Sequence, residues 1–263
     1  MADLEGLLGD LADESNDLER LVTPLTREQW ATATPAEGWS IAHQIGHLAW
    51  TDEIATISAS DEEQFAKLVA EAGPRVLTFV DDAAEEAAAE PPAQLLQRWR
   101  RGRAALADAL RAVPDGAKVP WFGPPMSAAS MVTARTMETW AHGQDVADAL
   151  GITRTPTARL RTVAHIGART RNFAYMVRGR QAPKEEFRIE LTAPDGSLWT
   201  WGPADAAQRV TGPAVDFCLL VTQRRHRDDL ALTAVGAAAA EWLTIAQAFA
   251  GPSGKGRAAG QFA

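Results

Sequence analysis

Residues 40–57 read Ser-Ile-Ala-His-Gln-Ile-Gly-His-Leu-Ala-Trp-Thr-Asp-Glu-Ile-Ala-Thr-Ile, and their spacing predicts a helix with one apolar side. Ser40 is a favourable N-cap residue for it. The apolar residues at helical spacing are Ile41, Ile45, Leu48, Ala49, Ile54 and Ile57. His47 falls within this apolar set rather than on the side of Asp52 and Glu53. The pattern therefore predicts that the His47 imidazole points to the protein interior.

Other segments of the first half share this helical period. Residues 3–22 place leucines among acids, Pro91-Pro92 opens a helix over residues 93–113, and Ser127 begins a helix that stops at Gly151. Residues 61–88 continue as helix with an interruption at Gly73-Pro74, whereas residues 114–125 form a Pro- and Gly-rich aromatic loop. The four principal helices predict an antiparallel bundle.

The second half changes character after Pro156. Residues 187–191 and 197–201 alternate in polarity around the turn Ala193-Pro-Asp-Gly, which predicts a β-hairpin. Helices are expected over residues 157–178, 214–222 and 234–249. The fold class is therefore expected to be α+β, with a helical bundle over residues 1–153 and a smaller α+β domain, made of the hairpin and C-terminal helices, over residues 154–263.

Composition excludes several classes of protein. The formal net charge of −8 argues against a protein that binds nucleic acid through a basic face. The chain shows no signal peptide and no apolar run of about 20 residues, so we expect a cytoplasmic protein that does not enter a membrane. The single cysteine, Cys218, lies in an apolar run and is expected to be a buried, inert thiol. The size of the chain allows a monomer or a homodimer.

Three residues have the composition of a metal site. Glu138 and His142 are four residues apart on one predicted helix, so their side chains emerge from the same face. His47, from an earlier helix, supplies a third ligand, and two imidazoles with one carboxylate are typical of catalytic zinc or another divalent metal. Three protein ligands leave a coordination position for water or a thiolate. The alternative is a bundle in which His47 is a hydrogen-bonded core residue.

Several neighbouring residues have two interpretations each. His43, one turn before His47, is more consistent with a structural role at the edge of the interior than with a fourth ligand or a residue that orients a ligand. Arg135 and Asp145 either orient the ligands or form a surface pair. Trp121, in the Pro- and Gly-rich loop, is a candidate for the mouth of a pocket.

Two segments carry a resemblance to a known family. They are Gly38-Trp-Ser-Ile-Ala-His-Gln-Ile-Gly-His-Leu-Ala and Arg135-Thr-Met-Glu-Thr-Trp-Ala-His-Gly-Gln-Asp-Val-Ala-Asp-Ala-Leu-Gly. The chain resembles the DinB-like superfamily and, within it, actinobacterial proteins of the mycothiol-dependent maleylpyruvate isomerase type. The resemblance implies a four-helix bundle in which His47, Glu138 and His142 bind a divalent metal, commonly Zn²⁺. Residues 199–203 and 210–221 resemble the small α+β domain attached to many such members.

The same resemblance implies mycothiol as cosubstrate. Coordination to a dication deprotonates a thiol, and the thiolate can then add reversibly to a double bond or attack an electrophilic carbon of a small substrate. The first course gives an isomerase and the second a transferase. The resemblance also implies an arginine of the small domain near the site. Arg224 occupies that position, with Arg225 and Arg227 as alternatives, and an arginine there can bind a substrate carboxylate through two hydrogen bonds.

Two further functions stay open at this point. An open metal site can also activate water, which would make the chain a hydrolase or a lyase. Alternatively, the chain can bind a metal or a small molecule without catalysis, as a sensor or a sequestering protein does. The ligand residues do not distinguish these outcomes, because they do not show whether the surrounding groups that activate a substrate are complete.

Overall fold

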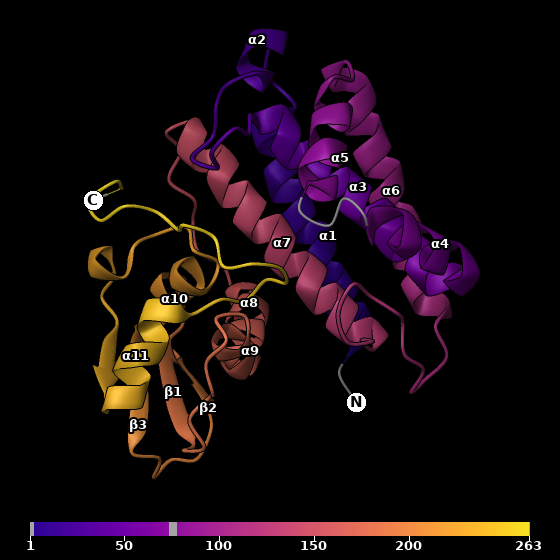
Figure 1. Cartoon of the computed structure of the whole chain (residues 1–263). Coiled ribbons are helices and arrows are strands. Elements are labelled where there is room, and N and C mark those ends of the chain that lie inside the picture. Colours follow the sequence, from indigo (N-terminus) through magenta and orange to yellow (C-terminus); the bar gives the residue numbers. More distant parts are fainter. Residues whose placement is uncertain (1–2, 74–77, 263) are drawn as a thin grey trace. The chain divides into compact units, whose positions relative to one another are not determined.

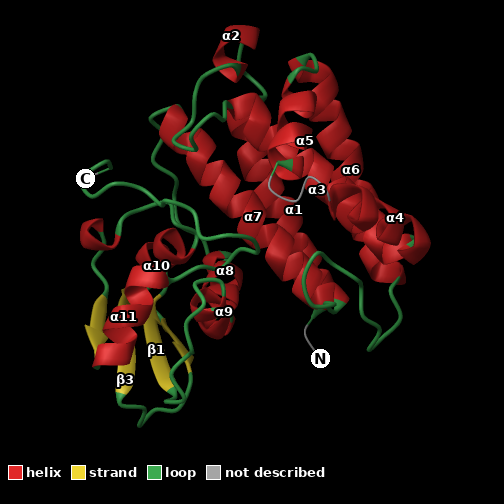
Figure 2. Cartoon of the chain, in the orientation of Figure 1, coloured by secondary structure: helices red, strands yellow, loops and turns green. Residues whose placement is uncertain are grey.

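The structure is a computed structural model that describes residues 3–73 and 78–262. The chain divides into two compact units, Met1–Arg154 and Thr155–Ala263. The first unit is built from helices, and among the described residues all strands of the sheet belong to the second unit (Figures 1 and 2). The predicted α+β class is therefore confirmed.

Four long helices form the frame of the first unit. They are α1 (Leu4–Val22), α3 (Ile41–Ser60), α6 (Pro92–Ala112) and α7 (Ala128–Ala149), and the shorter helices are α2 (Arg27–Trp30), α4 (Glu62–Ala72) and α5 (Phe79–Ala88). Their ends follow the predicted signals: the Ser127 side chain accepts a hydrogen bond from Ser130 N, and Pro92 opens α6. Helix α3 packs against α5, α6 and α7, and α1 packs along α7.

Helix α3 is the central helix of this unit. It is buried on most sides, because other helices of the unit surround it. Asp52, which the sequence places on a polar side of the helix, is 3% exposed, so that expectation is wrong. Gly46 allows α5 to approach closely, since a Cβ at this position would lie 2.7 Å from the Cβ of Ala87. The predicted helix over residues 61–88 is two helices, α4 and α5, and Pro74 of its predicted interruption lies outside the described residues.

The second unit combines helices with a mixed sheet. Its elements are α8 (Leu160–Arg169), α9 (Arg171–Met176), β1 (Phe187–Thr192), β2 (Leu198–Trp201), β3 (Gln208–Pro213), α10 (Ala214–Val221), β4 (Thr233–Val235) and α11 (Ala237–Ile245). The strand order is β2-β1-β3-β4, with β1 antiparallel to β2, parallel to β3, and β3 antiparallel to β4. The predicted hairpin is the β1–β2 pair, in which Leu191 faces Trp199.

Two strands of this sheet were not expected from the sequence. Strand β3 lies outside every predicted element, and residues 234–235 fall within the helix predicted over residues 234–249. They instead belong to β4, where Ala234 pairs with Val210, and α11 begins only at Ala237. Gly236 separates the two elements with φ +94°, a backbone conformation that favours glycine.

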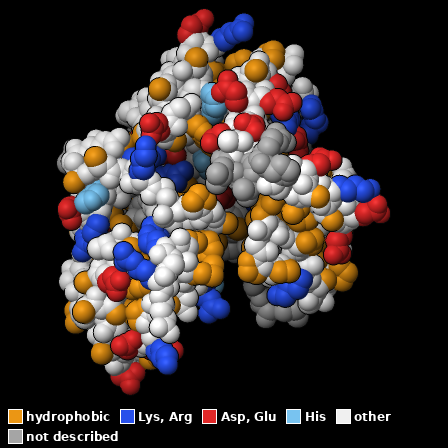
Figure 3. Space-filling view, in the orientation of Figure 1, with side chains coloured by type: hydrophobic (Ala, Val, Ile, Leu, Met, Phe, Trp, Pro, Cys, Tyr) orange, Lys and Arg blue, Asp and Glu red, His pale blue; other side chains and the backbone are white. Residues whose placement is uncertain are grey.

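The surface carries both signs of charge. Acidic and basic side chains are interspersed over the face drawn in Figure 3. Within residues 3–73 and 78–262, no helix has the length and apolar character needed to cross a bilayer.

Candidate metal centre

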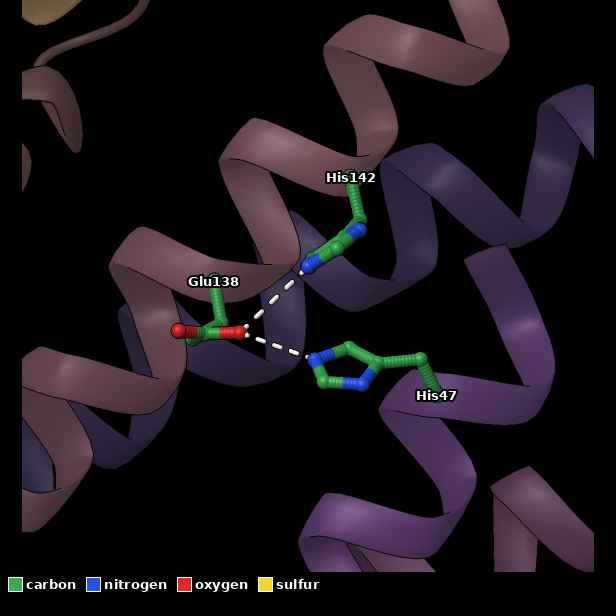
Figure 4. Close-up of side chains that lie close together, drawn as sticks. All are labelled: His47, Glu138 and His142. Atoms are coloured by element: carbon green, nitrogen blue, oxygen red, sulfur yellow. Dashed lines mark hydrogen bonds and ion pairs between the residues drawn. The ribbon is translucent and has the colours of Figure 1, made fainter. Parts of the chain in front are cut away.

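The structure brings the three predicted ligands together in the first unit. Helix α3 supplies His47, and α7 supplies Glu138 and His142 from successive turns (Figure 4). Glu138 Oε2 lies 3.1 Å from His47 Nε2 and 3.4 Å from His142 Nε2. One ligand atom from each residue lies within 4.8 Å of the other two. Two imidazole nitrogens and one carboxylate oxygen therefore converge on a common point.

A buried amide determines which nitrogen of His142 carries its proton. His142 Nδ1 is hydrogen-bonded to Gln44 Oε1, and an amide oxygen only accepts, so Nδ1 is the donor. Gln44 Nε2 donates to Thr34 Oγ1 at 2.8 Å, and Thr34 Oγ1 donates to the Trp39 carbonyl at 2.8 Å. In neutral His142 the lone pair therefore sits on Nε2 and faces the carboxylate. A cation between these two acceptor atoms would satisfy both, so the residues fit a divalent metal.

His47 is enclosed by α3 itself and by aromatic rings. Its Nδ1 is buried and has no hydrogen-bond partner among the described residues, which leaves Nε2 as the nitrogen that faces the site. Thr51, one turn later, donates its hydroxyl to the His47 carbonyl at 2.5 Å and lies 3.5 Å from Nε2. Trp39 stacks on His142 with ring centroids 5.9 Å apart and lies 5.3 Å from the His47 ring. Trp39 therefore covers one side of the imidazoles, whereas 22% of the Glu138 side chain stays exposed.

The carboxylate of Glu138 is ionised in this environment. Burial alone would raise its pKa, but the adjacent rings of His142 and His47 hold the pKa of Glu138 well below its usual range. An ionised carboxylate between two imidazoles supplies the anionic ligand that a divalent metal requires.

A buried ion pair of Arg135 and Asp52 lies next to the Glu138 carboxylate. Arg135, 1% exposed, donates from Nε to Asp52 Oδ1 at 3.0 Å, and its Nη1 lies 3.9 Å from Glu138 Oε2. Of the two interpretations of Arg135, the surface pair is wrong, because both partners are buried. Asp145 is also buried, at 0% exposure. Burial raises the pKa of Asp52, and Arg135 opposes this rise.

Other predicted neighbours lie away from the triad. The His43 ring is hydrogen-bonded to Ser40 Oγ and to Glu85 Oε2, each at 2.7 Å, which fits its structural interpretation and not that of a fourth ligand. Trp121 stacks on Phe65, and the neighbouring Phe122 lines a cavity instead. The sequence analysis predicts neither the hydrogen bond of Gln44 to His142 nor the burial of Asp52. A glutamine within an apolar helical run does indicate a buried polar contact.

The arginines proposed from the sequence belong to the second unit. Arg224 Nη1 donates to the Thr222 carbonyl at 2.6 Å, and Arg225 Nη1 donates to the Arg224 carbonyl at 2.7 Å. Arg227 donates to the carbonyls of Leu230 and Leu232. A role for Arg224 at the triad therefore stays a prediction.

Comparison with known families places the first unit. The model described as "Mycothiol maleylpyruvate isomerase N-terminal domain" matches residues 11–147, more than half of the chain, and this match includes all three triad residues. The chain belongs to this family. The family resemblance seen in the sequence is thereby confirmed. A second model, described as "Wyosine base formation", matches residues 183–235, the segment that contains the four strands.

Relatives of this mycothiol maleylpyruvate isomerase family member cover most of its length. An uncharacterized protein found in two strains of Mycobacterium tuberculosis is 58% identical over 257 residues, 98% of this chain and 100% of that protein. The solved structure of the mycothiol-dependent maleylpyruvate isomerase has a TM-score of 0.57 at 17% identity, over 84% of this chain and 89% of that one. A histidine-to-alanine mutant of that enzyme gives 0.61 at 19% identity, over 88% and 92%. These structures show a shared fold.

Proposed function

We propose that the chain is a divalent-metal-dependent enzyme that uses mycothiol to isomerise or conjugate a small electrophilic substrate. The observation that carries the proposal is the convergence of His47, Glu138 and His142 on one point in a member of this family. The two Nε2 atoms and Glu138 Oε2 would hold the metal, and this donor set favours Zn²⁺. When bound, the metal keeps a coordinated thiol in its thiolate form.

The chain's own residues prepare the site for this chemistry. Gln44 holds His142 with its Nε2 lone pair toward the ligand position, and Arg135 places a positive charge beside Glu138. Trp39 covers both imidazoles and limits the access of water, which favours a thiolate over hydroxide as nucleophile. In this proposal Arg224 of the second unit binds the carboxylate of an anionic electrophile.

Two outcomes share the same first step. The thiolate forms a bond to an electrophilic carbon of the substrate. If that carbon belongs to a conjugated double bond, rotation and expulsion of the thiolate return the isomerised substrate, which is a cis-trans isomerisation. If the carbon carries a leaving group, the group departs with the bonding electrons and the thioether stays, which is a transfer.

The experiment compares turnover with and without the thiol. Zinc-loaded chain is incubated with mycothiol and either maleylpyruvate or an alkyl halide, and isomer and thioether are measured by mass spectrometry. We expect thiol-dependent turnover, its loss in Glu138→Gln, and its retention in the control His43→Ala, which removes a histidine of α3 outside the triad. Thiol-independent hydrolysis of test esters, with no isomer or thioether formed, would contradict the proposal.

A further inference from the structure

The first unit contains a cavity beside the triad. Its volume is about 220 Å³. Residues of α3, α4, α5 and α6 and of the loop before α7 line it, and those used below are Trp50, Phe79, Phe122, Glu71, Glu86 and Arg98. Sites for whole small ligands start at roughly 300 Å³, so this cavity is suited to one part of a ligand rather than to all of it.

Trp50 connects the cavity to the triad. Its ring centroid is 6.1 Å from that of His47 and 5.7 Å from that of Phe79. Phe79 in turn lies 5.3 Å from Phe122, which is 40% exposed. The cavity therefore has an aromatic wall that begins one ring away from a proposed metal ligand. A ligand group on this wall can belong to a molecule whose other end reaches the metal.

The charges of the lining select the kind of group. Glu71 and Glu86 contribute carboxylates. The guanidinium of Arg98 is already bound by both oxygens of Glu53, at 2.7 and 2.6 Å, and by Glu90 at 2.6 Å. Among the described residues the lining is therefore negative, and it disfavours an anionic electrophile. Aromatic faces with carboxylate acceptors suit a ring that has apolar C–H faces and hydroxyl donors.

We propose that this cavity binds the hydroxyl-rich part of the thiol cosubstrate, which deepens and rests on the function proposed above. Mycothiol carries its thiol on an N-acetylcysteinyl group joined to glucosamine and inositol. One of these rings packs on Trp50 and Phe79, and its hydroxyl groups donate to Glu86 and Glu71. The N-acetylcysteinyl arm then extends past Trp50 toward His47, and the anionic electrophile enters from another side.

The first test uses N-acetylglucosaminylinositol, in which an acetyl group replaces the N-acetylcysteinyl arm of mycothiol and the sugar nitrogen stays an uncharged amide. It is titrated by calorimetry into the zinc-loaded chain and into Trp50→Leu, Glu86→Gln and the control Glu62→Gln, an exposed acid of α4 outside the cavity. We expect binding to the wild type and the control, with affinity about tenfold weaker in Glu86→Gln because a charged hydrogen bond is lost. Absence of binding to the wild type, or equal binding to all four proteins, overturns the proposal.

A second measurement separates this inference from the proposed function. In the cobalt-substituted chain, a thiolate-to-metal absorption band reports coordination of either mycothiol or N-acetylcysteine. We expect Trp50→Leu and Glu86→Gln to raise the mycothiol concentration needed for half of the band about tenfold, and to leave the N-acetylcysteine titration unchanged. An equal shift for both thiols overturns the cavity assignment. A wild type without a band for either thiol contradicts the proposed function, whereas the calorimetric result still decides the cavity.

Discussion

Replacement of Gln44 by leucine is expected to weaken metal binding without touching a metal ligand. Gln44 is completely buried, and its amide makes one hydrogen bond to His142 Nδ1 and one to Thr34 Oγ1. Leucine has a similar volume but no acceptor, so His142 loses the group that fixes its tautomer and its ring orientation. Loss of such a partner typically lowers metal affinity 10- to 100-fold, or about 1.4 to 2.8 kcal/mol.

The same substitution has a second, separable effect on stability. The buried His142 N–H and the Thr34 hydroxyl lose their partner, which costs about 1 to 3 kcal/mol in the metal-free chain. Zinc affinity is measured by competition with a chromophoric chelator, and the free energy of unfolding by urea titration of the metal-free protein. Gln44→Glu is the matched control, because a carboxylate still accepts from Nδ1 and keeps the affinity high. A folded Gln44→Leu protein with zinc affinity within about twofold of the wild type would refute the role of this amide.

Three other substitutions or probes test the packing around the site. Arg135→Met leaves the Asp52 carboxylate buried without its partner and is expected to lower the free energy of unfolding by about 3 to 5 kcal/mol. The double variant Arg135→Met, Asp52→Leu is expected to recover most of this loss. If the effects of the two substitutions on unfolding in urea simply add, the two residues are not coupled as a pair. Gly46→Ala is expected to destabilise the chain, because the added Cβ would lie 2.7 Å from the Cβ of Ala87. This overpacking costs about 1 to 3 kcal/mol, whereas the better helix propensity of alanine returns about 1 kcal/mol. A higher midpoint of unfolding in urea would contradict this expectation. Burial raises the pKa of Cys218 well above its usual value, so we expect its thiol to stay protonated and to react with a disulfide reagent only after unfolding. Prompt labelling of the native chain would be incompatible with this burial.

The helical half of the fold was predictable because its signals are local. Ser40, Pro92 and Ser127 mark helix starts in the sequence, and the structure begins helices at or directly after them. The position of Glu138 and His142 on the same face of one helix follows from their spacing of four residues. These features depend on the chain within one or two turns, which is the range that a sequence pattern describes.

The parts that were missed depend on distant partners. Strand β4 has three residues and exists because Ala234 pairs with Val210 of β3. The local pattern places Asp52 on a polar side of its helix, whereas its partner Arg135 comes from another helix and donates to it at 3.0 Å. The hydrogen bond of Gln44 to His142 likewise joins two helices. Such contacts join residues that are far apart in the sequence, and no pattern within a few residues of either partner predicts them.

Equilibrium dialysis against buffered zinc, with metal and protein quantified in the same samples, tests the metal site most directly. We expect one zinc ion per wild-type chain and per His43→Ala chain, and strongly reduced occupancy in His47→Ala, Glu138→Ala and His142→Ala at the same free zinc concentration. Equal occupancy in all five proteins, or no zinc in the reconstituted wild type, would contradict a metal centre formed by these three residues.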